Sequence, residues 1–201
     1  MPRPKTRIQQ KNSETILEAA LDVFSQQGYR GATLDQIAEV AGLSKPNLLY
    51  YFASKEAIYQ SLMTALLDTW LDPLRKLDEG GDPVTEIKGY MRRKLELSRD
   101  FPRESRLFAN EILQGGPRIR AAIEGELKML VDDTAIVLRR WMDQGRIARM
   151  EPVHLIFSIW ALTQHYADFD MQVRAVLGEG HDPFAEAGAF LETLYTKLLA
   201  P

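Results

Sequence analysis

The sequence predicts an all-α protein of about nine helices. Apolar residues recur at the three- and four-residue spacing of amphipathic helices along most of the chain. Glycine and proline interrupt this spacing at intervals typical of helix ends and turns. The alternation of apolar and polar residues that marks β-strands is not seen, nor is any internal repeat or low-complexity tract. Helices packed on helices are therefore expected.

Composition is that of an ordinary soluble protein with a core. Of the 201 residues, 45% are hydrophobic and 26% are charged. The absence of cysteine excludes disulfides, thiolate zinc sites and cysteine nucleophiles. No apolar run is long enough to span a bilayer, and the N-terminal residues lack the apolar segment of a signal peptide. We therefore expect a cytoplasmic location.

Charge is distributed unevenly along the chain. Residues 1–55 carry seven basic and five acidic side chains, a balance of +2, whereas the other 146 residues carry 18 and 23, a balance of −5. Residues 1–11 contain Arg3, Lys5, Arg7 and Lys11 and no acidic residue. This flexible basic arm is either a solvated tail or a segment that contacts phosphates.

The first two helices follow from their end signals. Apolar residues at helical spacing begin after Ser13 and stop at Gly28, which predicts a helix of about fifteen residues. A second, very short helix begins after Thr33, with Gln36 three places later as a capping-box pair. It ends at Gly42.

The next two helices complete a helix-turn-helix. Ser44 is placed to cap a third short helix, and Ser54 to cap a fourth. A helix, a glycine turn and a short second helix form the pattern of this motif. The fourth helix keeps its apolar period to Pro73, long enough to bridge two domains. Further helices are expected at about 84–100, 104–114, 118–144, 152–177 and 184–199.

Residues 44–51 have the properties of a helix that enters the DNA major groove: short, polar outside and fixed by neighbours. The residues expected to pack inward are Leu48, Leu49 and Phe52. Those expected to face DNA are Ser44, Lys45, Asn47 and Tyr51. Lys55 would add a cation for the phosphate backbone. The alternative interpretation is a surface loop in a helical bundle that carries two half-buried tyrosines.

The run TLDQIAEVAGLSKPNLLYYFASKEAIY resembles the N-terminal DNA-binding domain of the TetR family of bacterial transcription regulators. The matching residues are Thr33, Ile37, Ala38, Ala41, Gly42, Ser44, Tyr50, Tyr51, Phe52 and Lys55. Tyr51 departs from the histidine of many members, and an aromatic phosphate contact survives that exchange. The resemblance implies a homodimeric repressor whose DNA-binding domain spans 12–58 and whose ligand-binding and dimerisation domain spans 59–201. The DNA-binding residues it implies are Thr33, Ser44, Lys45, Asn47, Tyr50, Tyr51 and Lys55.

Three segments of the C-terminal part extend the resemblance: LLDTWLDPL, IKGYMRRKLELSRDFPRESRLFANEIL and HLIFSIWALTQHYADF. They are similar to pyrimidine-utilisation repressors of this family, which sense uracil and thymine. The resemblance makes Trp70 and Trp160 ligand residues, although a tryptophan on an apolar helix face is more often core. A buried Gln164 would offer a donor and an acceptor to the imide edge of uracil. A different small ligand remains open.

Other chemistry has little support. The three histidines lack metal-ligand spacing, so no metal or cofactor is expected. His165 and Asp168 have no serine nucleophile in a recognisable elbow beside them, and Arg106 is expected to be a structural charge. An enzyme is therefore not expected. The remaining alternative to a ligand-responsive DNA-binding regulator is a helical binding module with no DNA role.

Overall fold

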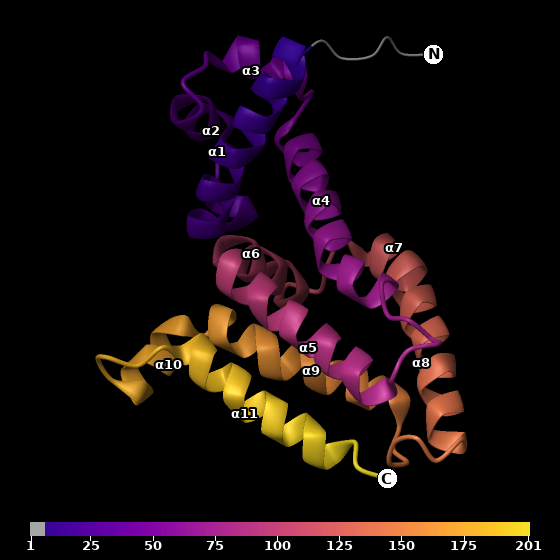
Figure 1. Ribbon diagram of the computed structural model, residues 1–201. Coiled ribbons are helices and arrows are strands. Elements are labelled where there is room, and N and C mark those ends of the chain that lie inside the picture. The colour runs from indigo at the N-terminus through magenta and orange to yellow at the C-terminus, as the bar shows by residue number, and fades with distance from the viewer. Residues whose placement is uncertain (1–6) are drawn as a thin grey trace. The chain divides into compact units, whose positions relative to one another are not determined.

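The computed structural model describes residues 7–201, which form two compact units (Figure 1). The first unit contains the chain up to Leu67 together with Arg106–Ile119, and the second contains Asp68–Ser105 and Arg120–Pro201. No strand occurs in the described part of the chain, which confirms the all-α class. Arg3 and Lys5 of the basic arm lie outside the described residues. The boundaries expected for the functional domains stay a prediction.

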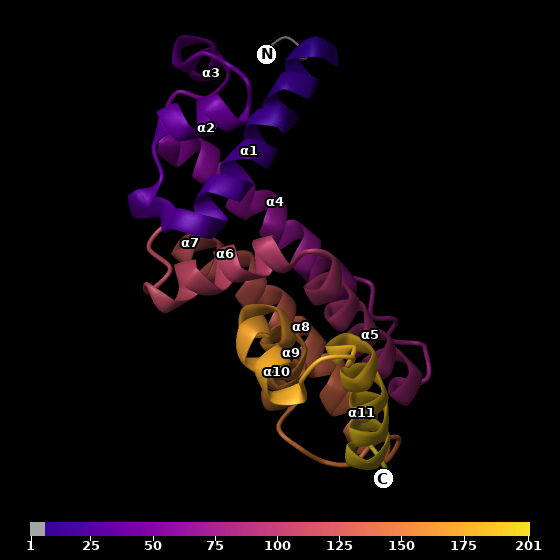
Figure 2. The same ribbon diagram turned by 90° about the vertical axis from the view of Figure 1, so that its left-hand side faces the viewer.

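The first unit is built on α1 (Arg7–Gly31), α2 (Leu34–Val40) and α3 (Lys45–Tyr51). Residues Lys55–Leu67 of α4 (Lys55–Arg75) and most of α6 (Pro102–Leu113) complete it. Figure 2 shows α2 and α3 beside α1, and the three helices contact one another. Its fully buried apolar residues include Ile16, Phe24, Ile37, Leu48 and Ile58, each at 0% exposure. These residues come from all four N-terminal helices, so one small core fixes α3.

In the second unit, α5 (Pro83–Asp100), α9 (Pro152–Asp168) and α11 (Pro183–Leu198) pack against one another (Figure 1). The α8 helix (Lys128–Asp143) packs on α9, and α10 (Asp170–Leu177) contacts α9 and α11. Their shared core includes Met91, Trp141, Leu191 and Tyr195. The sequence marks the starts of α5, α9 and α11, since Pro83, Pro152 and Pro183 each stand in a first helical turn.

Several helix boundaries differ from those expected. The α1 helix begins at Arg7, so residues 7–11 of the expected arm are helical, and it continues past a kink at Gly28, whose φ of 67° favours glycine. The segment expected as one helix at 118–144 is α7 (Arg120–Ala122), a π-helical turn (Ile123–Leu127) and α8. The segment at 152–177 breaks at Phe169, without a glycine or proline signal. The α4 helix continues two residues beyond Pro73.

Candidate nucleic-acid interface and effector site

The link between α2 and α3 is fixed by local hydrogen bonds. The Thr33 hydroxyl accepts from the backbone N–H of Gln36, while the side-chain Oε1 of Gln36 accepts from the backbone N–H of Thr33 at 2.9 Å, so the expected capping box is confirmed. Gly42 has a φ of 66°, and the following amide of Leu43 donates to the Ala38 carbonyl at 2.9 Å. This left-handed turn ends α2 and suits glycine. The turn therefore sets the direction in which α3 leaves.

The N-terminus of α3 and one of its faces are open to solvent. Ser44 caps the helix by accepting from the Asn47 amide, as expected. The side chains of Ser44, Lys45, Asn47 and Tyr50 are exposed. Leu48 and Phe52 pack inward, one helical turn apart. Leu49 was expected to pack inward too, but it is 39% exposed, because a seven-residue helix turns only one narrow stripe to the core.

The adjacent tyrosines tie α3 to the beginning of α1. The Asn12 amide donates to the Tyr51 hydroxyl at 2.7 Å, and the Gln9 amide donates to the Tyr50 hydroxyl at 3.1 Å. The two tyrosine rings meet edge to face at 5.1 Å between centroids. Sequence reasoning did not anticipate Gln9 and Asn12, because the bonds join residues about 40 positions apart. The two tyrosine hydroxyls therefore hold α3 against α1, while the Tyr50 side chain stays exposed to solvent.

Lys45 has a weak partner on the surface. Its ammonium pairs with the Asp35 carboxylate at 2.9 Å, and the two side chains are 45% and 70% exposed. Such exposed pairs contribute about 0–1 kcal/mol, so DNA phosphate can displace the carboxylate. The ammonium is therefore available to an anion.

Lys55 is held more firmly. Its half-buried ammonium donates to the carbonyls of Tyr29 and Ala32 at 2.8 and 2.7 Å, and it lies 4.5 Å above the Tyr29 ring. Two of its three N–H groups are thus used at the C-terminal end of α1. One N–H is left for the predicted phosphate contact. Thr33, at the N-cap of α2, is exposed beside this end.

The three predicted effector residues come from α4 and α9. Trp70 on α4 is 5% exposed, and its ring meets Phe101 at 6.4 Å between centroids. The Trp70 indole Nε1 is buried without a hydrogen-bond partner. On α9, the Trp160 indole donates to the Tyr90 hydroxyl at 2.6 Å, and Gln164 is half-buried one turn later. Their meeting in one pocket stays a prediction.

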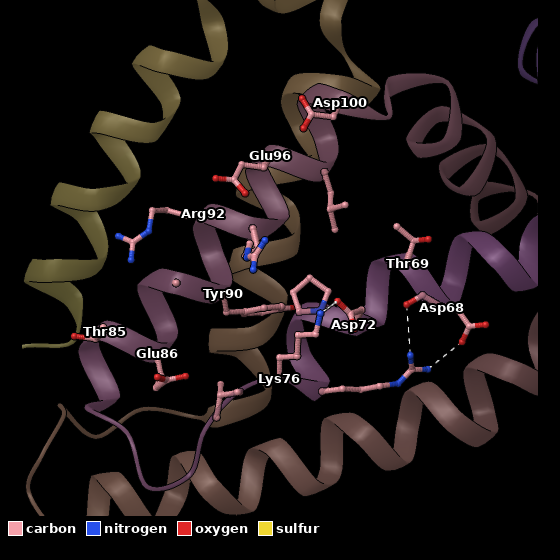
Figure 3. A pocket seen from close by; sticks show the side chains of 16 residues that line it. Asp68, Thr69, Asp72, Lys76, Thr85, Glu86, Tyr90, Arg92, Glu96 and Asp100 are labelled. Carbon is pink, nitrogen blue, oxygen red and sulfur yellow. Dashed lines mark hydrogen bonds and ion pairs between the residues drawn. The ribbon is translucent and has the colours of Figure 1, made fainter.

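An open groove of about 800 Å³ lies elsewhere in the second unit, between α4 and α5 (Figure 3). Its side chains are mostly charged, with Asp68 and Asp72 from α4 and Glu86 and Arg92 from α5. None of the three predicted effector residues lines it. Mixed exposed charges favour water over a flat apolar ring, so the groove does not replace the predicted site.

Several large apolar side chains are exposed on α9, α10 and α11 and at the junction of α9 with α10. The members of this set, each at least 40% exposed, are Phe157, Phe169, Met171, Val176, Phe190 and Leu198. Exposed large apolar side chains occur elsewhere on the chain too, for example Leu113 at 82% and Met129 at 62%, so the assignment of this set to a dimer interface stays a prediction. The helices expected to mediate dimerisation thus carry apolar residues open to a partner.

The first unit also contains a buried ionic network. The Tyr59 hydroxyl donates to the Glu111 carboxylate at 2.9 Å, and the Arg118 amide N–H donates to the same carboxylate at 2.9 Å. The Glu111 side chain is 1% exposed, and the Arg118 guanidinium lies 3.5 Å from the Tyr29 ring centroid. Burial and the neighbouring carboxylate raise the pKa of Tyr59. Sequence reasoning missed this network.

Residues 7–201 contain neither of two further kinds of site, a metal-binding cluster or a membrane-spanning helix. No group of three or more His, Asp or Glu side chains is arranged to hold a metal ion there. Across the same residues, no helix has the length and apolarity needed to span a bilayer.

Two family models cover nearly all of the chain. The model described as "Bacterial regulatory proteins, tetR family" matches residues 16–62, and that for the "YcdC-like protein, C-terminal region" matches residues 63–201. Among curated proteins, the chain is 50% identical to the HTH-type transcriptional regulator RutR of Escherichia coli strain K12 over 174 residues, which cover 87% of this chain and 82% of RutR. It is 26% identical to the uncharacterized HTH-type transcriptional regulator YfiR of Bacillus subtilis over 77% of each chain. These relatives are named as regulators, not as enzymes.

Solved structures share the fold. The structure of AibR in complex with isovaleryl coenzyme A and operator DNA superposes with a TM-score of 0.73 at 20% identity, covering 94% of this chain and 99% of AibR. KstR2 of Mycobacterium tuberculosis, named as a ketosteroid transcriptional regulator, superposes with a TM-score of 0.75 at 19% identity, covering 94% and 95%.

Proposed function

Because the chain belongs to the tetR family of bacterial transcription regulators, we propose that it is a repressor released from its operator by uracil or thymine. The repressor binds a palindromic operator as a homodimer. The observation that carries DNA binding is the capped α3 helix, whose Ser44, Lys45 and Asn47 face solvent. A helix in this position enters the major groove by its N-terminal residues.

The proposed DNA contacts fall into two kinds, those to base edges and those to the phosphate backbone. Asn47 is the base reader, because its amide can pair with both groups of an adenine edge. Lys45 and Lys55 contact phosphates, and Thr33, Ser44 and the two tyrosine hydroxyls position the backbone. The helix N-terminus at Ser44 adds amide N–H groups for a phosphate.

Dimerisation places two α3 helices on one operator. The exposed apolar residues of α9, α10 and α11, such as Phe157 and Phe190, supply the interface. A symmetric dimer matches a palindrome, with half-sites separated by about 34 Å or a multiple of one DNA turn. Light scattering is expected to give about twice the chain mass of 22.9 kDa, and a mass of 22.9 kDa at micromolar concentration excludes the dimer.

The pyrimidine assignment is supported by the similarity to RutR and by the side chains at the expected positions. Trp70 and Trp160 supply flat walls, and Gln164 reads the imide edge. A ligand releases DNA only when it binds more tightly to the conformation that does not fit the operator. The α4 helix contains Trp70 and also contributes to the first unit, so a shift of α4 is the simplest route for this effect.

Gel-shift titration on an inverted repeat tests both parts of the proposal. We expect operator binding that falls steeply with salt, because phosphate contacts release counterions. Uracil and thymine are expected to release the DNA, and cytosine to do so poorly, because an unpaired buried donor or acceptor costs about 1–3 kcal/mol. Gln164→Ala is expected to abolish the uracil response while operator affinity without ligand is unchanged. Retained operator binding without any heat of uracil binding would remove the pyrimidine and keep the regulator.

A further inference from the structure

A lysine is buried in the second unit, on the face that α5 turns toward α4 and α9. Lys94 is 3% exposed, and its Nζ lies 5.4 Å from the centroid of the Trp70 ring. Among the described residues, the groups seen to act on this ammonium are the Trp70 ring and the charge of Asp168. A charged group at this depth normally has a hydrogen-bond acceptor, because taking an ammonium out of water is costly.

Trp70 supplies a second donor at the same place. Its Nε1–H is buried and has no hydrogen-bond partner. Buried polar atoms without partners are rare, and each one calls for an explanation such as a ligand or a bound water. Two donors therefore belong to one ring and its neighbour: the Trp70 N–H at the ring edge, which has no partner among the described residues, and the Lys94 ammonium over the ring face.

The register of α5 against α9 places Gln164 close to the level of Lys94. Tyr90 on α5 accepts from Trp160 on α9, and Lys94 follows Tyr90 by one turn, as Gln164 follows Trp160. The next turn of α9 brings Asp168, whose charge acts on Lys94. Tyr90 meets Trp160, and Lys94, later on α5, is acted on by Asp168, later on α9, so the two helices run in the same direction and Gln164 lies on the turns of α9 between Trp160 and Asp168.

We propose that Lys94 and the Trp70 indole N–H form a two-donor site for the carbonyl oxygens of a planar ligand such as uracil, and that Lys94 selects ligands by this contact. The inference rests on the proposed function and adds to it a residue that the sequence did not indicate. Uracil carries two carbonyl oxygens, so it can accept from both donors. Cytosine has an amino group in place of one carbonyl and would set a donor against a donor.

The ionisation of Lys94 gives this contact a distinctive signature. Burial lowers the pKa of Lys94 to about 7, and Asp168, the charged group whose field reaches it, partly opposes this shift. From α4 the group facing Lys94 is the Trp70 ring, which does not titrate. A carbonyl acceptor favours the charged ammonium and raises its pKa, so ligand binding takes up a proton from the buffer.

The pH dependence of the proton uptake follows from this pKa. Because the pKa of free Lys94 is about 7 and binding raises it, proton uptake on binding is expected to be larger at pH 8, where the free ammonium is mostly deprotonated, than at pH 6. The affinity for uracil is then expected to be weaker at pH 8 than at pH 6.

Calorimetric titration of the full chain with uracil, in two buffers of different ionisation enthalpy at pH 6 and pH 8, measures this uptake. Lys94→Met keeps the length of the side chain and removes the charge, so it is expected to bind uracil more weakly, with no proton uptake and no pH dependence. Its melting temperature reports whether it folds. Lys88→Met, on the same helix but paired with Glu192 at the surface, is the matched control and is expected to titrate like the wild type.

The experiment distinguishes failure of the role of Lys94 from failure of the pyrimidine assignment. Uracil binding without proton uptake, and with equal affinity in Lys94→Met, would overturn the role of Lys94 and leave the pyrimidine repressor standing. A wild type that gives no heat with uracil at either pH would overturn the pyrimidine assignment together with this inference, while operator binding would still show a regulator.

Discussion

Lys55 offers a test that separates a role in folding from a role in DNA binding. Its ammonium donates to the Tyr29 and Ala32 carbonyls, so Lys55→Met leaves both acceptors without this partner. Hydrogen bonds from a charged group contribute about 1.5–3 kcal/mol each, and the half-buried position favours the lower value. The expected loss is therefore about 3 kcal/mol of the free energy of unfolding. For a chain of this size, it corresponds to a decrease of about 6–12 °C in melting temperature.

Lys45→Met is the control for this variant. Lys45 has an exposed partner, Asp35, so the same substitution is expected to cost about 0–1 kcal/mol. Differential scanning fluorimetry of both variants and the wild type compares the two lysines directly. A Lys55→Met variant that melts with the wild type would refute the argument that the two carbonyls hold this side chain.

The salt dependence of operator binding gives the second readout. Removing one phosphate contact lowers the slope of log affinity against log salt by about 0.9. We expect that decrease, per protomer, in Lys45→Met. The third N–H of Lys55 predicts a similar decrease in Lys55→Met when it is measured at a temperature where the variant is folded. An unchanged slope there would remove Lys55 from the residues that bind phosphate.

Four further outcomes are expected. Asn47→Ala relaxes base specificity at one operator position by about 1–3 kcal/mol in competition gel shifts. Tyr51→Phe loses the bond from Asn12 and about 0.5–1.5 kcal/mol of stability in denaturant unfolding. Phe190→Glu, in the exposed apolar surface, gives monomers by light scattering. Above pH 7, the free energy of unfolding of the wild type rises relative to that of Lys94→Met by about 1.4 kcal/mol per pH unit, because the unfolded lysine still binds a proton that the folded one has lost. If the two proteins show parallel curves of unfolding free energy against pH, the lowered pKa of Lys94 is contradicted.

Local signals in the sequence predicted local structure well. The caps at Thr33 and Ser44 and the glycine turn at Gly42 depend on residues within four positions of one another, so a pattern can contain them. The helix break at Phe169 has no such signal, since neither glycine nor proline stands there. The seven-residue length of α3 also exposed Leu49, against the apolar pattern.

Tertiary contacts set the part of the site that the sequence could not predict. The partners of Lys55 are backbone carbonyls more than 20 positions earlier, and carbonyls leave no mark in a sequence. Lys94 lies among the charges of an amphipathic helix, so its pattern indicates a solvent-facing residue, yet it is 3% exposed. Trp70 could be assigned to a core or a ligand from its pattern; its unpaired indole N–H became visible only in the structure.

The α6 helix connects these observations. Ser105, near its beginning, belongs to the second unit and donates to Asp168 at 2.6 Å, the residue whose charge acts on Lys94. Glu111, near its end, belongs to the first unit and is fixed by Tyr59 and Arg118. Buried ionic networks of this kind have few alternative arrangements, because breaking one leaves an uncompensated charge. The α6 helix therefore contributes residues to both networks, Ser105 to the one around Asp168 and Glu111 to the one around Tyr59, and we expect Ser105→Ala to change the response to uracil more than the operator affinity without ligand.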